Sequence, residues 1–304
     1  MSRATVVFGN GLGMALDPDY FLLESGLREV WSGSPHFNEQ HKRLVASAIP
    51  GIVGDAHPST EVQLDQLQVA IVASEFLREF ETNEVKWLAQ EASELPEAFK
   101  RFLHEVASYF HNHQFPLPID FVTALAEFTN RTKSHITTLN YDNLLYDGFK
   151  GHGVFNGYRG SLLDGFLANG FASTNLDRFY PARHGWYLHL HGSPLFVGNR
   201  KIMGEERRFF EPNESSHIVL THVEHKPLII ERSDILTTYW SYFHDALAES
   251  ETYILFGYSG ADVHLNRALA DRVNERTVHV IEWSGSGDQR WSRKFEQVDK
   301  CSLP

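Results

Sequence analysis

Two short segments of the sequence place polar side chains directly after an apolar, strand-like run. Asn140 and Asp142 follow Ile136–Leu139, and His191 follows Trp186–Leu190. In an open α/β sheet, ligands bind outside the carboxyl ends of the strands. An amide, a carboxylate and an imidazole at such ends could bind a sugar hydroxyl and move a proton. We therefore treat these side chains as a candidate active site.

Each segment also has a purely structural interpretation. Asn140 and Asp142 could form an Asx turn that caps a short helix over 143–146. His191 could be a structural histidine that donates to a backbone carbonyl. His189 and His191 alternate on the strand, so both side chains are expected to face the same side, and a His-x-His pair can bind a metal. A metal site needs three or four ligands, and no companion Asp or Glu stands at an obvious spacing, so we expect no metal.

Glycines mark the loop after the first predicted strand. Gly9, Asn10 and Gly11 follow the apolar run Ala4–Phe8, and a helix is expected after Asp17-Pro18. Glycine lets the backbone turn tightly and approach a phosphate, with amide N–H groups as donors. The spacing is not that of the usual dinucleotide fingerprint. A plain tight turn is therefore the alternative.

A similar loop follows a later strand-like run. Gly257 and Ser259 could bring the backbone and a hydroxyl to a phosphate at the start of a helix over 263–273. The alternative is a capped loop with Asp262 as the N-cap. Glu282 follows the last predicted strand, where acidic residues often bind a dinucleotide ribose. A surface carboxylate is the other interpretation.

The order of the predicted elements indicates the fold class. Strands that alternate with helices, such as the helix expected over Ile235–Leu247, predict an α/β fold with a mostly parallel, doubly wound sheet. Short apolar runs rich in β-branched or aromatic residues give the strands: Ala4–Phe8, Ile136–Leu139, Trp186–Leu190, Ile218–Leu220, Tyr253–Phe256 and Thr277–Ile281.

A helical block interrupts this alternation. Apolar residues recur at helical spacing over 62–76 and again over 99–110, and Asp120 is placed to cap a third helix. We predict one domain over 1–304 with a mainly helical insertion over 36–133. The segment Gly151–Gly185 is predicted to form loops over the site.

Composition limits the function classes. The 304 residues are 42% hydrophobic and 22% charged, which is typical of a globular protein. A formal net charge of −12 argues against a broad phosphate-binding surface, so no direct nucleic-acid partner is expected. No apolar run or leader indicates a membrane segment or export, which favours a cytoplasmic location. The single cysteine, Cys301, excludes an internal disulfide and a Cys-rich zinc site.

The segments resemble, in this order, the sirtuin-like domains of bacterial antiphage systems. Those domains carry a glycine-rich first motif, a Thr-Asn-Tyr-Asp segment, a Leu-His-Gly-Ser segment and a late Gly-Tyr-Ser motif. The resemblance implies a Rossmann-like NAD-binding fold and cleavage of NAD+. It implies that Asn140 positions the attacking water or the nicotinamide ribose, and that His191 acts as general base toward the ribose. It implies that Asp142 binds a ribose hydroxyl and that Gly9, Asn10, Gly11, Gly257 and Ser259 surround the phosphates. The predicted cofactor-binding set also includes Tyr141 and Asp262, which lie in the same motifs, and Glu282, which is included for its position after the last predicted strand.

Two departures from the family pattern shape the expected chemistry. Classical protein-deacylating sirtuins hold a four-cysteine zinc module, which a chain with one cysteine lacks. The resemblance therefore implies NAD+ hydrolysis rather than deacylation. Asn10 stands where the family usually has a small alanine, and the usual following serine is missing, so the resemblance does not specify how this loop meets the cofactor.

The resemblance implies an NAD+ glycohydrolase of an abortive-infection defence system. Many such proteins carry a sensor domain, whereas this chain ends soon after the last predicted strand, at Pro304. We therefore expect control by a homo-oligomer or by a separate partner, for which the resemblance indicates a HerA-like hexameric ATPase. The alternatives are a non-catalytic NAD- or ADP-ribose-binding sensor or scaffold, a deacylase, and a metal-dependent hydrolase built on His189 and His191.

Overall fold

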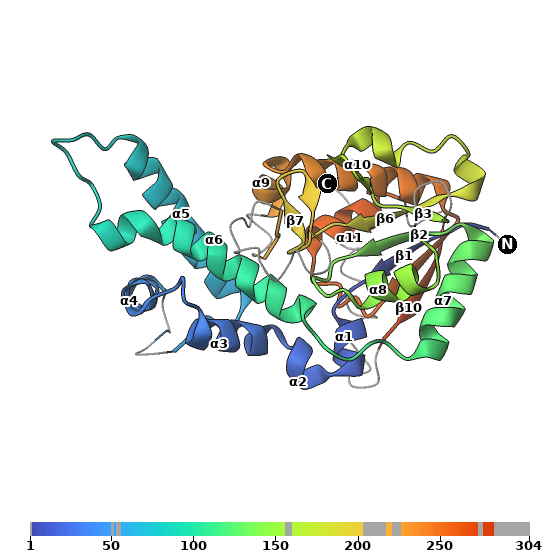
Figure 1. Cartoon of the computed structure of the whole chain (residues 1–304), viewed down its shortest axis with the longest axis horizontal. Helices are drawn as coiled ribbons and strands as arrows, with labels where there is room; N and C mark the ends of the chain where they lie inside the picture. The colour runs from blue at the N-terminus through green and yellow to red at the C-terminus, as the bar shows by residue number, and fades with distance from the viewer. Residues whose placement is uncertain are drawn as a thin grey trace.

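A parallel β-sheet forms the centre of the molecule (Figure 1). The computed structural model describes residues 2–49, 52, 56–155, 160–202, 217–220, 226–272 and 276–282. Within these ranges the sheet has six strands in the order β10-β9-β1-β2-β6-β3, and every pairing is parallel. This confirms the predicted Rossmann-like α/β fold. The strands are β1 (Ala4–Phe8), β2 (His135–Thr138), β3 (Leu162–Leu163), β6 (Gly185–His189), β9 (Thr252–Phe256) and β10 (Thr277–Ile281).

Helices cover both faces of the sheet because the buried side chains of β1 alternate between two cores. Val6 and Phe8 belong to one hydrophobic cluster, which includes residues of α1, α7 and α8. Val7 belongs to the other, which includes residues of α10 and α11. The helices are α1 (Gly11–Leu16), α2 (Pro18–Phe21), α3 (Leu23–Gly33), α4 (Glu39–Ala48), α5 (Glu61–Glu79), α6 (Gln90–His111), α7 (Ile119–Thr132), α8 (Leu144–Gly151), α9 (Lys226–Glu231), α10 (Asp234–Glu249) and α11 (Val263–Ala270).

The order in which the chain adds strands to the sheet changes side at β1. From β1 the chain continues to β2 and then to β6 on one side, and it returns to β9 and β10 on the other side. Phe8, the last residue of β1, pairs with Thr138 of β2 and with Phe256 of β9. The loops that leave these three strands therefore lie side by side, at the type of switch point where α/β sheets bind ligands.

The helical block between β1 and β2 begins at Gly11, earlier than predicted, and extends away from the sheet. The predicted apolar stripe of α6, which includes Phe99, Phe102 and Val106, is buried. Helix α5 packs against α6 through Leu64, Leu67 and Ile71. The end of α5 and the start of α6 project from the main body, and we call this projection the arm (Figure 1).

Several local predictions were wrong. The segment Ile218–Leu220 was predicted to be a strand. Among the described residues it forms an isolated antiparallel bridge instead, between Ile218 and Gly192. The segment predicted as loops over the site contains β3 and the hairpin of β4 (Phe166–Leu167) and β5 (Gly170–Phe171), followed by two short 3₁₀ turns. Asp120 lies in the first turn of α7 rather than at its cap.

Shorter elements complete the described part of the chain. A hairpin of β7 (Phe196–Val197) and β8 (Arg200–Lys201) follows β6. Cys301 lies outside the described residues, as does Val273 at the predicted end of α11. None of the described helices is long and apolar enough to cross a membrane.

Candidate active site

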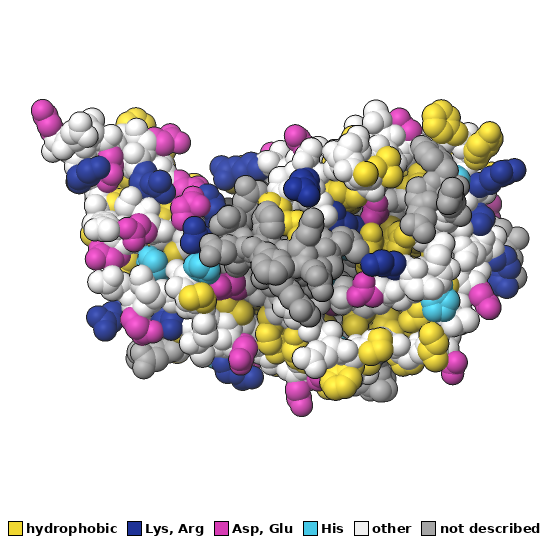
Figure 2. All heavy atoms as spheres, in the orientation of Figure 1, with side chains coloured by type: hydrophobic (Ala, Val, Ile, Leu, Met, Phe, Trp, Pro, Cys, Tyr) yellow, Lys and Arg dark blue, Asp and Glu magenta, His cyan; other side chains and the backbone are white. Residues whose placement is uncertain are grey.

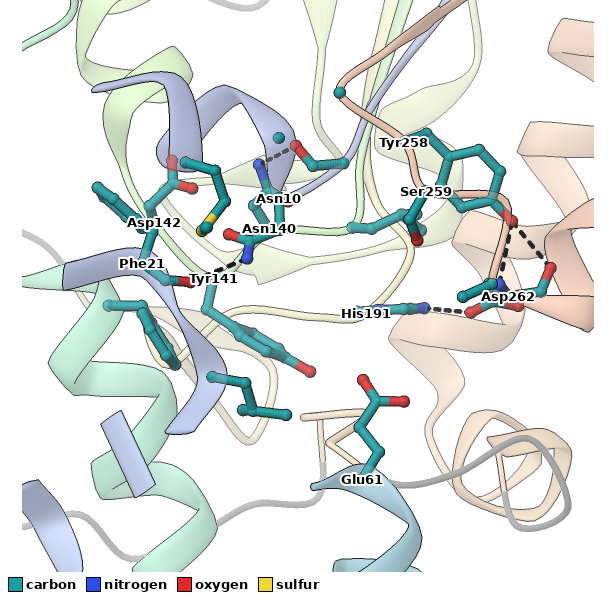
Figure 3. Close-up of a pocket in the computed structure, with 18 of the residues that line it drawn as sticks. Asn10, Phe21, Glu61, Asn140, Tyr141, Asp142, His191, Tyr258, Ser259 and Asp262 are labelled. Carbon is teal, nitrogen blue, oxygen red and sulfur yellow. Dashed lines mark hydrogen bonds and ion pairs between the residues drawn. The ribbon is translucent and has the colours of Figure 1, made fainter. Parts of the chain in front are cut away.

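A pocket of about 430 Å³ opens at the carboxyl ends of the central strands (Figure 3). This volume lies in the range of small-molecule sites in proteins. The pocket brings together every residue predicted for the site. These are Gly9, Asn10, Gly11, Asn140, Tyr141, Asp142, His191, Gly257, Ser259, Asp262 and Glu282. None of the described residues of 151–185 lines this pocket, and residues 156–159 of that segment lie outside the described residues.

The glycines of the first loop hold it against the loop after β9. The Gly9 N–H donates to the Phe256 carbonyl at 2.9 Å, and the Gly11 N–H donates to the Gly257 carbonyl at 2.7 Å. A Cβ on Gly11 would lie 2.5 Å from the Gly257 Cα, closer than real Cβ contacts. The N–H groups of Gly9 and Gly11, which were expected to donate to a phosphate, thus donate to backbone carbonyls of the protein. The glycines permit close backbone packing, and α1 starts immediately, at Gly11.

Asn140 links the loop after β2 to the loop after β1. Its side chain is buried and donates from Nδ2 to the Gly9 carbonyl at 3.1 Å. Asn10 donates from its own Nδ2 to the Phe21 carbonyl at 2.9 Å, which ties the first loop to α2. Figure 3 shows both amides in the upper part of the pocket. The two asparagines therefore fix the shape of the wall formed by the first loop.

Asp142 forms the Asx turn that the sequence left open. Its Oδ1 accepts the Leu144 N–H at 3.0 Å, at the start of α8. Burial raises the pKa of the Asp142 carboxyl to about 6. The neighbouring Tyr141 is held by its hydroxyl, which donates to the Val219 carbonyl, and burial raises its pKa. Both residues line the pocket while they organise the chain around it.

His191 and Asp262 form a hydrogen-bonded pair in the pocket wall. His191 Nε2 lies 3.0 Å from Asp262 Oδ2, and both residues are buried. The Lys226 ammonium lies 2.9 Å from the same carboxylate oxygen. Although burial opposes its ionisation, the pairing with His191 and Lys226 lowers the pKa of Asp262 well below its usual range. The carboxylate is therefore ionised at neutral pH.

An ionised Asp262 determines the proton positions on a neutral His191. A carboxylate can only accept, so Nε2 carries the proton and Nδ1 is left as an acceptor. A histidine oriented in this way by a carboxylate can remove a proton from a hydroxyl group. Asp262 also accepts the Leu265 N–H at 3.0 Å through Oδ1 and is the N-cap of α11, as the alternative interpretation of this loop expected.

The remaining predicted residues line the pocket beside this pair. Gly257 has φ +60°, a backbone conformation that favours glycine, and Ser259 is exposed at the pocket. The Tyr258 hydroxyl donates to the Asp262 carbonyl at 2.9 Å and holds this loop in place. Glu282 lines the pocket just after β10, on its exposed side.

His189 does not share the surroundings of His191. Its ring contacts those of Tyr187 and Phe196, with centroids 5.0 and 5.4 Å away, and neither ring nitrogen has a hydrogen-bond partner. Burial lowers its pKa well below the usual range, which keeps the ring neutral. His189 does not line the pocket. Within the described ranges, no group of three or more His, Cys, Asp or Glu side chains is arranged to hold a metal ion.

Two charged pocket residues were missed by sequence reasoning. Lys226 begins α9 and Glu61 begins α5, and the structure brings both to the pocket. Neither directly follows one of the described strands, so the strand-end signal that located Asn140 and His191 does not apply to them. An acidic residue in the first turn of a helix is also common because it complements the helix dipole. That local explanation accounts for Glu61 without reference to its position at the pocket.

An all-parallel sheet with glycine loops packed at its switch point is an arrangement at which α/β proteins bind nucleotides and other ligands. Comparison with protein-family models identifies the class more narrowly. A model of the SIR2-like domain matches residues 134–285, half of the chain, and the chain belongs to this family. SIR2-like domains bind NAD+ and are NAD-dependent enzymes. A search of curated proteins found no match.

Proposed function

We propose that the protein is an NAD+ glycohydrolase that cleaves NAD+ to nicotinamide and ADP-ribose. The observation that carries this proposal is the His191–Asp262 pair, which lines the same pocket as Asn140 in a SIR2-like domain. A protein that only binds NAD+ has no chemical need for a histidine oriented by an ionised carboxylate.

The reaction places specific demands on such a pocket. The bond between C1 of the ribose and the nicotinamide nitrogen breaks, and nicotinamide leaves with the electron pair. Positive charge then builds on C1 and on the ring oxygen, and a water oxygen bonds to C1 and loses a proton. A site that fixes the sugar among preorganised polar groups stabilises this transition state. His191 would accept a hydrogen bond from a ribose hydroxyl, and Asn140 would position the water or the nicotinamide ribose.

Water is the favoured acceptor because the deacylase apparatus is missing from the sequence. Protein-deacylating sirtuins use a four-cysteine zinc module beside the acyl-lysine groove, and this chain has one cysteine. The helical block occupies part of the pocket rim instead, through Phe21, Leu22 and Glu61.

The direct test is release of nicotinamide from NAD+, for the wild type and for His191→Ala. We expect release by the wild type and a loss of about 10²–10⁴-fold in the variant, the usual contribution of a general base. Titration with NAD+ by calorimetry runs alongside. Binding without release, by the protein alone or as an assembled oligomer, would instead identify a sensor or scaffold.

We further propose that the enzyme acts in antiphage defence and is controlled by assembly, because free NAD+ hydrolysis is toxic to a cell. The arm offers an apolar surface for such assembly. Phe76, Phe80, Val85 and Trp87, at and near the end of α5, are all exposed. In Figure 2 the arm projects from the body, and on this face Lys and Arg side chains are interspersed with Asp and Glu. Particle mass and nicotinamide release, measured together across protein concentration, test this control, with a HerA-like ATPase as the added partner.

A further inference from the structure

One pocket carboxylate comes from the helical block rather than from the sheet. Glu61 is the first residue of α5, after the cap Thr60. Figure 3 shows its side chain pointing from α5 into the pocket, toward His191. The loops that carry Asn140 and Ser259 lie on the other side of the pocket in this view. A sugar held at the strand ends would therefore have Glu61 facing it from the opposite wall.

Two of the other pocket carboxylates, Asp262 and Asp142, are engaged in hydrogen bonds within the protein. Asp262 accepts from His191, Lys226 and the Leu265 N–H. Asp142 is buried and accepts the Leu144 N–H. The Glu61 side chain is 44% exposed, and its closest ionic contact is the Lys226 ammonium, 3.8 Å from Oε2. Of these three carboxylates, Glu61 has the most capacity to accept a hydrogen bond from a molecule in the pocket.

Lys226 connects Glu61 to the His191–Asp262 pair. Its side chain is 5% exposed, and its ammonium contacts both Asp262 and Glu61. Attraction to a buried cation holds the Glu61 carboxylate inside the pocket, although 3.8 Å is too long for a hydrogen bond. Lys226 thus orients the Glu61 carboxylate, while the carboxylate oxygens can still accept a hydrogen bond from a molecule in the pocket.

We propose that Glu61 is a catalytic residue that accepts the proton of the attacking water, an assignment that rests on the proposed NAD+ hydrolysis. In the step, the water oxygen forms a bond to C1 of the ribose, nicotinamide leaves with its bonding electrons, and the water proton passes to a Glu61 carboxylate oxygen. Sugar hydrolysis with an oxocarbenium-like transition state commonly uses a carboxylate in this way, on the face opposite the leaving group. His191 and Asn140 then bind and position the ribose from the strand ends.

The test compares two acceptors of the ADP-ribosyl group. Labelled nicotinamide exchanges into NAD+ by attack of its ring nitrogen, which has no proton to lose, whereas water must lose one. Glu61→Gln is expected to lower the hydrolysis rate by about 10²–10⁴-fold. Exchange should continue at or above the wild-type rate, and KM for NAD+ should change only a few-fold. The ratio of exchange to hydrolysis therefore rises.

Matched variants separate this role from a structural one. Glu79→Gln changes the same residue type at the far, exposed end of α5 and should behave as wild type. Glu61→Asp keeps a carboxylate one carbon shorter and should recover part of the hydrolysis. Equal loss of exchange and hydrolysis in Glu61→Gln, or loss of neither, would overturn the assignment. A wild type that catalyses neither reaction would overturn the proposed function with it.

Discussion

The imidazole of His191 and the carboxylate of Asp262 are hydrogen-bonded at 3.0 Å, although they come from loops after different strands. His191 follows β6, and Asp262 follows β9 and caps α11. Parallel pairing brings both strand ends to one edge of the sheet. The pair thus joins the two halves of the sheet across the pocket.

Asp262→Asn should reduce nicotinamide release by about 10–100-fold because an amide neither holds His191 in one tautomer nor stabilises its protonated form. The expected effect is on kcat, with little change in KM. Steady-state nicotinamide release measures both constants. His191→Ala and the double variant complete a cycle, in which the two losses should not add, since each removes the same pair. Fully additive losses would mean that the two residues act separately.

The same substitution should destabilise the fold. Asp262→Asn removes the carboxylate 2.9 Å from the Lys226 ammonium, which is 5% exposed, and leaves this cation the longer contact to Glu61, at 3.8 Å. Removal of one partner of a buried ion pair costs about 3–5 kcal/mol. Unfolding in urea should show this decrease, and Asp262→Asn combined with Lys226→Met should regain part of it. If the double variant were no more stable than the single one, the unpaired charge would not be the cause.

Asp142 should make stability depend on pH. Burial raises its folded-state pKa to about 6, above the ordinary value of 3.8. The folded state therefore binds more protons between these values. The stabilisation is fully present below about pH 4 and is lost as the pH rises through about 6.

Asp142→Asn is neutral at every pH and keeps an oxygen for the Leu144 N–H. Its free energy of unfolding relative to wild type should rise between pH 4 and pH 7, by up to about 3 kcal/mol. Urea unfolding at four pH values in this range measures the difference. A difference that stays constant with pH would show that Asp142 does not titrate in this way.

Gly11→Ala should separate the loops after β1 and β9. The added methyl would lie 2.5 Å from the Gly257 Cα, a backbone atom that cannot relieve the clash by rotation of a side chain. We expect KM for NAD+ to rise and stability to fall by about 1–3 kcal/mol. Gly33→Ala is the matched control, because a Cβ there meets nothing within 4 Å. Thermal unfolding and KM of the two variants should differ clearly, and identical behaviour would rule out the packing role.

The structure places at one pocket the candidate residues that the sequence located after strands. The polar groups after β1, β2, β6, β9 and β10 converge because parallel strands end at one edge, and all of them line the pocket. What the residues do there depends on contacts that no local pattern contains. The Gly9 N–H, expected at a phosphate, instead bonds the Phe256 carbonyl.

Other features lay beyond sequence patterns for physical reasons. Strand β3 has two residues, too few to show a period. The apolar run at Ile218 has a strand's composition, but it packs into the core with one isolated bridge. Lys226 and Glu61 reach the pocket through the tertiary arrangement of helices, which helical periodicity does not specify.

Helix α5 runs from this pocket to the exposed surface of the arm. Its 19 residues form a rod about 28 Å long. Glu61 stands at one end, against Lys226, while Phe76 lies near the other end with 58% of its surface exposed. Because a helix is stiff along its axis, the carboxylate in the pocket and the exposed aromatic ring on the arm belong to one rigid element.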